Sequence, residues 1–325
     1  MRRFGLAFNQ YFEKWMFLII PCSLLAGFFM ASELQYFIGA VPYLFAFVTF
    51  TMAMGCGMKQ LKASAGRPGL IILVFILAHM ISPIVAYAAG ILTFGADSPY
   101  VVGLVLFAII PLGVSSVLWV GMSGGNIPLM LAMVVLDSLL SPFVVPAGIH
   151  LFFNSAIEVE AGPIMLDLTI IIVLPTIIGV SLYEWSKGKI ADRVKPAAAP
   201  LSKLCFVLVV ALNAAAIAPY IGQLKQDMLT LVPLTIALVA FCYAIGYFAA
   251  AKLKDKGKQI TVSYATGMRN ISLGIVLALG YFSPLAAVPV VLSILIQQPM
   301  ATLHHYILQK LNNNKASETT SLHVG

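Results

Sequence analysis

The chain has 325 residues, of which 61% are hydrophobic and only 10% are charged. Soluble domains carry about 25% charged residues, so this composition excludes a soluble protein and predicts an all-α integral membrane protein. The net charge of +7 would suit nucleic-acid binding, but the distribution of the basic residues along the chain gives it another explanation.

Apolar segments of about 20 residues, the length that a helix needs to cross the hydrocarbon core, recur ten times along the chain. The connections between them are short, so we expect one transmembrane domain over residues 1–311 and a polar cytoplasmic tail over residues 312–325. The ten expected helices lie near residues 15–32, 37–57, 69–94, 99–122, 127–153, 163–185, 201–222, 228–251, 259–281 and 284–309.

The basic residues predict the orientation of these helices. If both termini are cytoplasmic, all of the 19 Lys and Arg residues except Lys225 and Arg269 lie on the inner side. This satisfies the positive-inside rule and predicts a multi-pass protein of the bacterial inner (plasma) membrane. The positive charge is therefore topological, and we expect the lipid bilayer and not nucleic acid as a partner. The oligomeric state is not predicted.

Two polar islands interrupt the apolar pattern. The ninth segment contains Thr266–Ser272 (T-G-M-R-N-I-S), and the fourth contains Pro111–Ser116 (P-L-G-V-S-S). An arginine at the centre of a membrane helix costs roughly 2.5–3.5 kcal/mol on insertion, so Arg269 needs a partner, a cavity or a ligand. Gly- or Pro-interrupted helices at matching places in two halves indicate a transporter's central site. Ordinary Gly/Ser helix packing is the alternative for the fourth segment.

The residues of these islands resemble those of the bile acid:sodium symporter family. T-G-M-R-N resembles the V-G-M-Q-N signature of that family, and Tyr281–Pro289 resembles the segment that follows it. Gly113–Pro146 also aligns without gaps on the family's G-T-A-S-N segment and the next helix. The resemblance implies ten transmembrane helices in two inverted five-helix repeats, about 15–153 and 163–309. It also implies a panel domain and a core domain, with helices four and nine broken and crossing at the binding site.

The chain departs from the family at the positions that would hold sodium. Ser116 retains one expected ligand, whereas Val117, Met130, Val134 and Ala265 stand where the resemblance implies polar side chains. Sodium needs hard oxygen ligands, which Val, Met and Ala side chains do not supply. We therefore expect sodium binding to be lost or weak, and we expect no other metal or cofactor.

Arg269 replaces the Gln of the signature, and two main roles are open for it. Its permanently charged guanidinium either stands in for the bound cation or binds an anionic substrate through bidentate contact; a purely structural role is a third alternative. The substrate-binding residues that we expect are Arg269, Asn270, Ser115, Ser116 and Thr266.

Asp137 is a second charge at membrane depth. It forms an ion pair with Arg269, carries a proton, or is simply hydrogen-bonded to a neighbouring helix. The expected ion-coupling residues are thus Arg269, Asp137 and Ser116. His79, Gln297 and Gln298 rank lower, because each is also explained by helix packing.

No catalytic constellation and no P-loop is present, so we expect neither an enzyme nor a primary pump. The expected function is alternating-access secondary transport of small or amphipathic organic anions, without sodium. A sodium-coupled symporter of bile acid or pantoate type is the alternative. A channel or a non-transporting membrane sensor is an alternative of another class.

Overall fold

The computed structural model describes residues 2–66, 68–153, 160–219 and 227–322, and their regular structure is helical. The first half contains α1 (Arg2–Phe29), α2 (Ala31–Leu34), the 3₁₀ helix η1 (Gln35–Ala40), α3 (Val41–Ala53), α4 (Met58–Ala65), α5 (Pro68–Ile76), the π-helical turn η2 (Leu77–Ile81), α6 (Ser82–Phe94), α7 (Pro99–Ile109), α8 (Ser116–Met122) and α9 (Ile127–Phe153). The second half contains α10 (Ala161–Leu168), the π-helical turn η3 (Thr169–Val173), α11 (Leu174–Ser186), α12 (Lys189–Ile217), α13 (Met228–Ala249), the 3₁₀ helix η5 (Ala250–Leu253), α14 (Lys256–Gly267), α15 (Ile271–Tyr281) and α16 (Pro284–Leu322).

The all-helical prediction is confirmed. In the described part of the chain, seven continuous helical stretches are long and apolar enough to cross a membrane. The apolar stretches Leu18–Phe29, Pro99–Ile109 and Ile271–Tyr281 are shorter. Two of these three belong to predicted spans that the structure divides, since segment 99–122 becomes α7 and α8, and segment 259–281 becomes α14 and α15.

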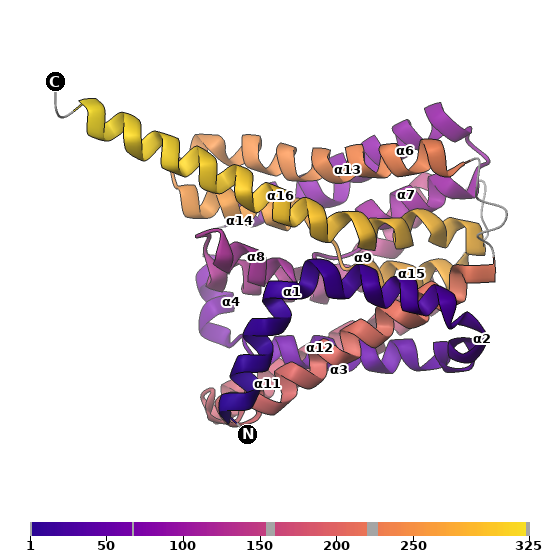
Figure 1. The fold of residues 1–325 in the computed structure, drawn as a ribbon, viewed down its shortest axis with the longest axis horizontal. Helices are drawn as coiled ribbons and strands as arrows, with labels where there is room; N and C mark the ends of the chain where they lie inside the picture. Colours follow the sequence, from indigo (N-terminus) through magenta and orange to yellow (C-terminus); the bar gives the residue numbers. More distant parts are fainter. Residues whose placement is uncertain (1, 67, 154–159, 220–226, 323–325) are drawn as a thin grey trace.

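Some boundaries differ from the prediction. The first helix begins at Arg2 and not near residue 15, and α12 begins at Lys189 and not near residue 201. At the other end, α16 continues to Leu322 and projects beyond the rest of the molecule (Figure 1), so the expected polar tail is helical as far as Leu322. The hydrophobic pattern predicts which part of a helix can lie in lipid. It does not predict the ends of the helix, which can extend into polar sequence.

The helices form two groups (Figure 1). In one group, α1 packs along α12, while α11 and α12 pack against α3. In the other, α7 packs against α6 and α16, and α13 packs against α14 and α16. Large apolar side chains such as Phe29, Leu92 and Leu151 are more than three-quarters exposed on the outside. Such an apolar surface is favourable only in lipid or against a partner, which agrees with a multi-pass membrane protein.

The end of α7 follows directly from the sequence. Pro111 has no backbone N–H to continue a helix, and it disfavours helical dihedral angles at the residue before it. Ile110 accordingly has φ −59° and ψ 156°, an extended conformation. The chain then runs without regular helix until α8 begins at Ser116.

A proline also has a local effect in the third span. In the π-helical turn η2, the N–H of Ser82 donates to the carbonyl of Leu77. The carbonyl of Ala78 would need the N–H of residue 82 in an α-helix or of residue 83 in a π-helix. Ser82 is already engaged and Pro83 has no N–H, so this carbonyl has no backbone donor.

Candidate functional site at the crossing of two broken helices

Two broken helices are joined through their backbones. We call residues 110–115, between α7 and α8, the first break, and residues 268–270, between α14 and α15, the second break. Leu112 and Arg269 face each other in an isolated antiparallel bridge. The N–H of Gly113 donates to the carbonyl of Met268 (2.9 Å), and the N–H of Asn270 donates to the carbonyl of Pro111 (2.8 Å). Backbone groups that two interrupted helices would leave unpaired are thus satisfied by each other, which is required in a water-free environment.

Two positions around the crossing leave room for glycine only. A Cβ atom on Gly113 would lie 2.8 Å from the backbone oxygen of Arg269, closer than real Cβ contacts allow. A Cβ atom on Gly267 would lie 2.4 Å from the ring of Tyr243. A larger side chain at Gly113 would push the two broken segments apart, and one at Gly267 would displace the ring of Tyr243 on α13.

Arg269 is buried, with 2% of its surface exposed. Its Nη2 donates to the carbonyl of Ala78 at 2.9 Å, the acceptor that the π-helical turn and Pro83 leave without a backbone donor. Its Nε and Nη1 have no hydrogen-bond partner in the described structure. The guanidinium therefore connects the second break to the third span through one hydrogen bond.

Two glutamines of α16 form hydrogen bonds with residues at the two breaks. Gln297 contacts both backbone groups of Arg269: its Oε1 accepts from the N–H (2.7 Å), and its Nε2 donates to the carbonyl (3.2 Å). Gln298 accepts from Nε1 of Trp119 (3.1 Å) and donates to Oγ of Ser115 (3.4 Å). Both residues therefore have positioning roles that their spacing in the sequence does not reveal.

Asp137 has a different partner from the expected arginine. Its Oδ1 lies 2.6 Å from Nε2 of His79, and its Oδ2 accepts from the N–H of Leu112 at 2.7 Å. The side chain in direct contact with Asp137 is thus His79, and Arg269 acts on Asp137 only through longer-range electrostatics. Packing of α9 against the first break brings Asp137 to the backbone of Leu112, so the alternative of a hydrogen bond to a neighbouring helix describes the contact.

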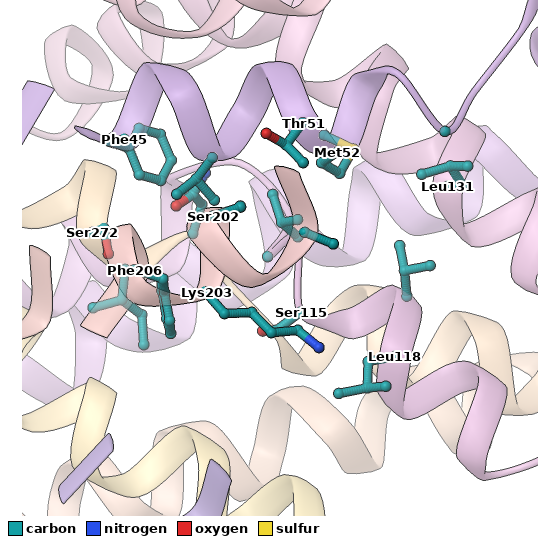
Figure 2. A pocket seen from close by; sticks show the side chains of 18 of the residues that line it. Phe45, Thr51, Met52, Ser115, Leu118, Leu131, Ser202, Lys203, Phe206 and Ser272 are labelled. Carbon is teal, nitrogen blue, oxygen red and sulfur yellow. The ribbon is translucent and has the colours of Figure 1, made fainter. Parts of the chain in front are cut away.

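A cavity of about 490 Å³ lies beside the crossing, between the two groups of helices. Figure 2 shows its lining side chains, which include Phe45, Met52 and Phe206 as apolar walls. Its polar groups come from the crossing, from Thr51 of α3, from α12 and from the two glutamines of α16. A space of this size, largely apolar with a few convergent polar groups, is typical of a small-molecule site.

The structure brings together most of the expected substrate-binding residues, but not all of them. Arg269, Asn270 and Ser115 line the cavity, as do Gln297 and Gln298. Ser116 and Thr266 are fully buried away from it. The hydroxyl of Ser116 donates to the carbonyl of Gly113, and that of Thr266 donates to carbonyls within α14. In this structure these two hydroxyls satisfy local backbone groups and do not line the cavity.

The four apolar residues at the positions where the family resemblance implies sodium ligands belong to the hydrophobic core or pack against it. Met130, Val134 and Ala265 are fully buried and belong to the main hydrophobic core, and Val117 packs against it. Hydrophobic side chains therefore occupy the space in which the family resemblance implies ion ligands.

Two lining residues were not anticipated as site residues. Lys195 and Lys203 of α12 line the cavity, although the charge pattern of the sequence indicates for them only a position on the inner side. Nζ of Lys203 donates to the carbonyl of Asn9 (3.2 Å) and lies 5.6 Å from the ring centroid of Phe12, both on α1. Their helical spacing of eight residues, which places both on one face of α12, was a signal that could have been noticed.

Broken helices whose backbones pair at membrane depth, beside a cavity with convergent polar groups, define a membrane transporter and not an enzyme. The chain belongs to the sodium bile acid symporter family, whose family model matches residues 42–224.

Three relatives illustrate the range of similar proteins. The uncharacterized protein YbaS of Bacillus subtilis is 31% identical over 90% of this chain and 96% of its own length. An uncharacterized sodium-dependent transporter of Bacillus subtilis, YocS, is 27% identical over 81% of each chain. A probable chloroplastic sodium/metabolite cotransporter of rice, BASS2, is 25% identical over 76% of this chain and 58% of its own length.

Proposed function

We propose that this protein is a secondary transporter of small or amphipathic organic anions, that it works by alternating access, and that it does not require sodium. The observation that carries the proposal is the charge of the cavity. Its described lining includes the cationic residues Lys195, Lys203 and Arg269 and no Asp or Glu. A cavity with one sign of charge and apolar walls favours a ligand with an anionic group and an apolar body.

The two breaks are held in corresponding ways, which supports an inverted repeat. The N–H of Leu112 in the first break donates to Asp137 of α9, and the N–H of Arg269 in the second donates to Gln297 of α16. The helix that follows each broken span thus supplies a side chain to the same backbone position. We infer ten transmembrane helices in two inverted five-helix repeats, with α7–α9 and α13–α16 in a core domain and α1, α3, α11 and α12 in a panel domain.

Two observations support sodium independence. Val117, Met130, Val134 and Ala265 supply no hard oxygen ligands, so the residues present do not fit a sodium site at those positions. Arg269 adds a fixed positive charge that is bonded to the carbonyl of Ala78. In this proposal Arg269 replaces the cation, while the lysines of α12 and the polar groups of Ser115 and Asn270 bind the anion.

The protein would lie in the inner membrane of a bacterium with both termini in the cytoplasm. Lys187, Lys189 and Lys195 lie at or near the junction of α11 and α12, which this topology places on the inner side. The positive-inside rule supports this orientation, and two of the relatives above come from a bacterium.

Thermal unfolding of the detergent-purified protein tests the proposal. A ligand that binds only the folded state raises the apparent Tm as its concentration exceeds its Kd, and it adds about 2.7 kcal/mol of stability at 100 times its Kd. We would titrate a bile acid and pantoate, each in sodium or choline chloride at equal ionic strength. We expect stabilisation by an organic anion that is the same in both salts.

A saturable shift that only sodium produces would overturn the sodium-independent mechanism and favour the sodium-coupled alternative. The double variant Arg269→Gln with Ala265→Glu then tests the replacement directly, because it restores the residues of the family. Exchange in proteoliposomes separates a carrier from a channel or a sensor: an anion on the far side accelerates efflux through a carrier only.

A further inference from the structure

His79 and Asp137 form a buried pair at the first break that the proposed transport mechanism has not used. Nε2 of His79 lies 2.6 Å from Oδ1 of Asp137, and their side chains are 3% and 8% exposed. We call this pair the dyad. Ionisable side chains at membrane depth are costly, and those that occur there frequently carry ions or protons.

The second polar atom of each side chain contacts the backbone of the break. Nδ1 of His79 lies 3.1 Å from the carbonyl oxygen of Ile109, and Oδ2 of Asp137 accepts the N–H of Leu112. Within a continuous helix, the carbonyl of Ile109 would accept from the N–H of Gly113, but that N–H donates to Met268 across the crossing. The dyad thus satisfies one acceptor and one donor that the break leaves without helical partners.

These contacts determine how many protons the dyad holds. The carbonyl oxygen of Ile109 can only accept, so Nδ1 of His79 must carry a hydrogen. The short contact between Nε2 and Oδ1 needs a second hydrogen between the two atoms, whichever of them holds it. The arrangement in the structure is therefore that of a dyad with two protons.

Loss of one proton breaks one of the contacts. If Nε2 becomes bare, its lone pair faces the carboxylate of Asp137; if Nδ1 becomes bare, its lone pair faces the carbonyl of Ile109. In either case two acceptors face each other in a buried site, which is unfavourable. Release of the proton would thus weaken either the contact of His79 with the carbonyl of Ile109 at the end of α7, or the contact between His79 and Asp137 of α9.

The neighbouring charged and titratable groups are few in the part of the chain that the structure describes. Arg269 comes from the second break and acts electrostatically on Asp137 and on Cys242 of α13. The ring of Phe75, which is apolar, packs on His79 with a centroid distance of 5.0 Å. Among the described residues, Arg269 is thus the fixed charge from another element whose electrostatic field reaches the dyad.

We propose that the dyad is a proton-binding site whose occupied form holds the first break, and that a proton here takes the coupling role that sodium has elsewhere in the family. The coupling part rests on the proposed transport function, whereas proton binding by the dyad does not. The proton count and the two backbone contacts carry the inference.

Asp137→Asn provides a sharp test because it reproduces the protonated dyad without a titratable proton. The Asn amide donates to Nε2 of His79, its oxygen still accepts from Leu112, and Nδ1–H of His79 still donates to Ile109. We would measure the apparent Tm of the full-length protein in detergent from pH 6 to pH 9, without any substrate. Asp167→Asn is the matched control, because Asp167 accepts a hydrogen bond from the hydroxyl of Tyr281 (2.6 Å).

The direction in which stability changes with pH follows from the number of protons that the folded and unfolded states bind. Above about pH 6.5 an unfolded His–Asp pair holds one proton and the folded dyad holds two, so stability falls as the pH rises until the folded dyad also releases its proton. We expect wild type and Asp167→Asn to lose about 2–4 °C per pH unit in this window, and Asp137→Asn to lose much less.

Equal slopes in wild type and Asp137→Asn, or a flat wild-type profile, would overturn the proposal. His79→Gln is the second variant in case Asp137→Asn does not fold, and it should also flatten the profile. Because no substrate is involved, a failure here leaves the organic-anion proposal intact. A failure to find a transported anion likewise leaves this test interpretable.

Discussion

Leu112 and Arg269 lie opposite each other in an antiparallel backbone bridge, and each has its N–H held by a side chain of the helix that follows its own broken span. For Leu112 this side chain is Asp137, and for Arg269 it is Gln297. Backbone pairing thus joins the two breaks, and side chains of the following helices support them. The first three of the four predictions below follow from this arrangement.

The first prediction concerns the close approach of the two breaks. Gly113→Ala would place a methyl group 2.8 Å from the backbone oxygen of Arg269. Backbone on both sides cannot move aside cheaply, so we expect a loss of about 1–3 kcal/mol and a lower apparent Tm. Gly280→Ala in α15 is the control, because a Cβ atom there meets nothing within 4 Å. Equal behaviour of the two variants would contradict the role of Gly113.

The second prediction concerns the support of Arg269. Gln297→Met keeps the volume of the side chain but removes both hydrogen bonds to the backbone of Arg269. A buried N–H and a buried carbonyl then lose their partners, and we expect a loss of about 1–3 kcal/mol for each in thermal or chemical unfolding. Gln35→Met serves as the control, since the Gln35 amide bonds to Ser32 at the exposed surface. An unchanged Tm for Gln297→Met would show that the crossing does not depend on this amide.

The third prediction separates pairing from charge at Asp137. Asp137→Ala leaves His79 and the N–H of Leu112 without their partner, so we expect a loss of about 3–5 kcal/mol, as for other broken buried pairs. Asp137→Asn keeps both contacts and should remain close to wild type at neutral pH. Comparison of the two unfolding midpoints checks this, and an Asn variant as unstable as the Ala variant would argue that the negative charge itself is needed.

The fourth prediction concerns anion binding. Lys203→Gln removes a positive charge from the cavity lining, and we expect the Kd of a bound organic anion to rise about tenfold, the effect of one charge-assisted hydrogen bond. The measurement is the apparent Tm as a function of anion concentration, from which the mass-action relation for a ligand of the folded state gives the Kd. Lys258→Gln is the control, since Lys258 pairs with Asp255 (2.6 Å) and does not line the cavity. A similar change in both variants would indicate a general charge effect and not a site.

Much of the architecture could be predicted from the sequence, because its causes are local or compositional. The hydrophobic content requires a membrane, and the apolar segments of 20 residues predict the spans. Pro111 predicts an extended residue before it and an end to α7, which the structure has at Ile110. The cost of an arginine in lipid identified Arg269 as a residue that needs a partner before any partner was known.

The partners themselves were decided by the tertiary structure. Asp137 bonds to His79 and not to Arg269, because α9 packs against α7 and α8 on either side of the first break, and this packing determines which side chain Asp137 can reach. Arg269 finds the carbonyl of Ala78, which is available only because a π-helical turn and a proline leave it without a backbone donor. A sequence states which groups need a hydrogen bond or a counter-charge. Which group supplies it depends on contacts between residues far apart in the chain, and only the packed helices determine those.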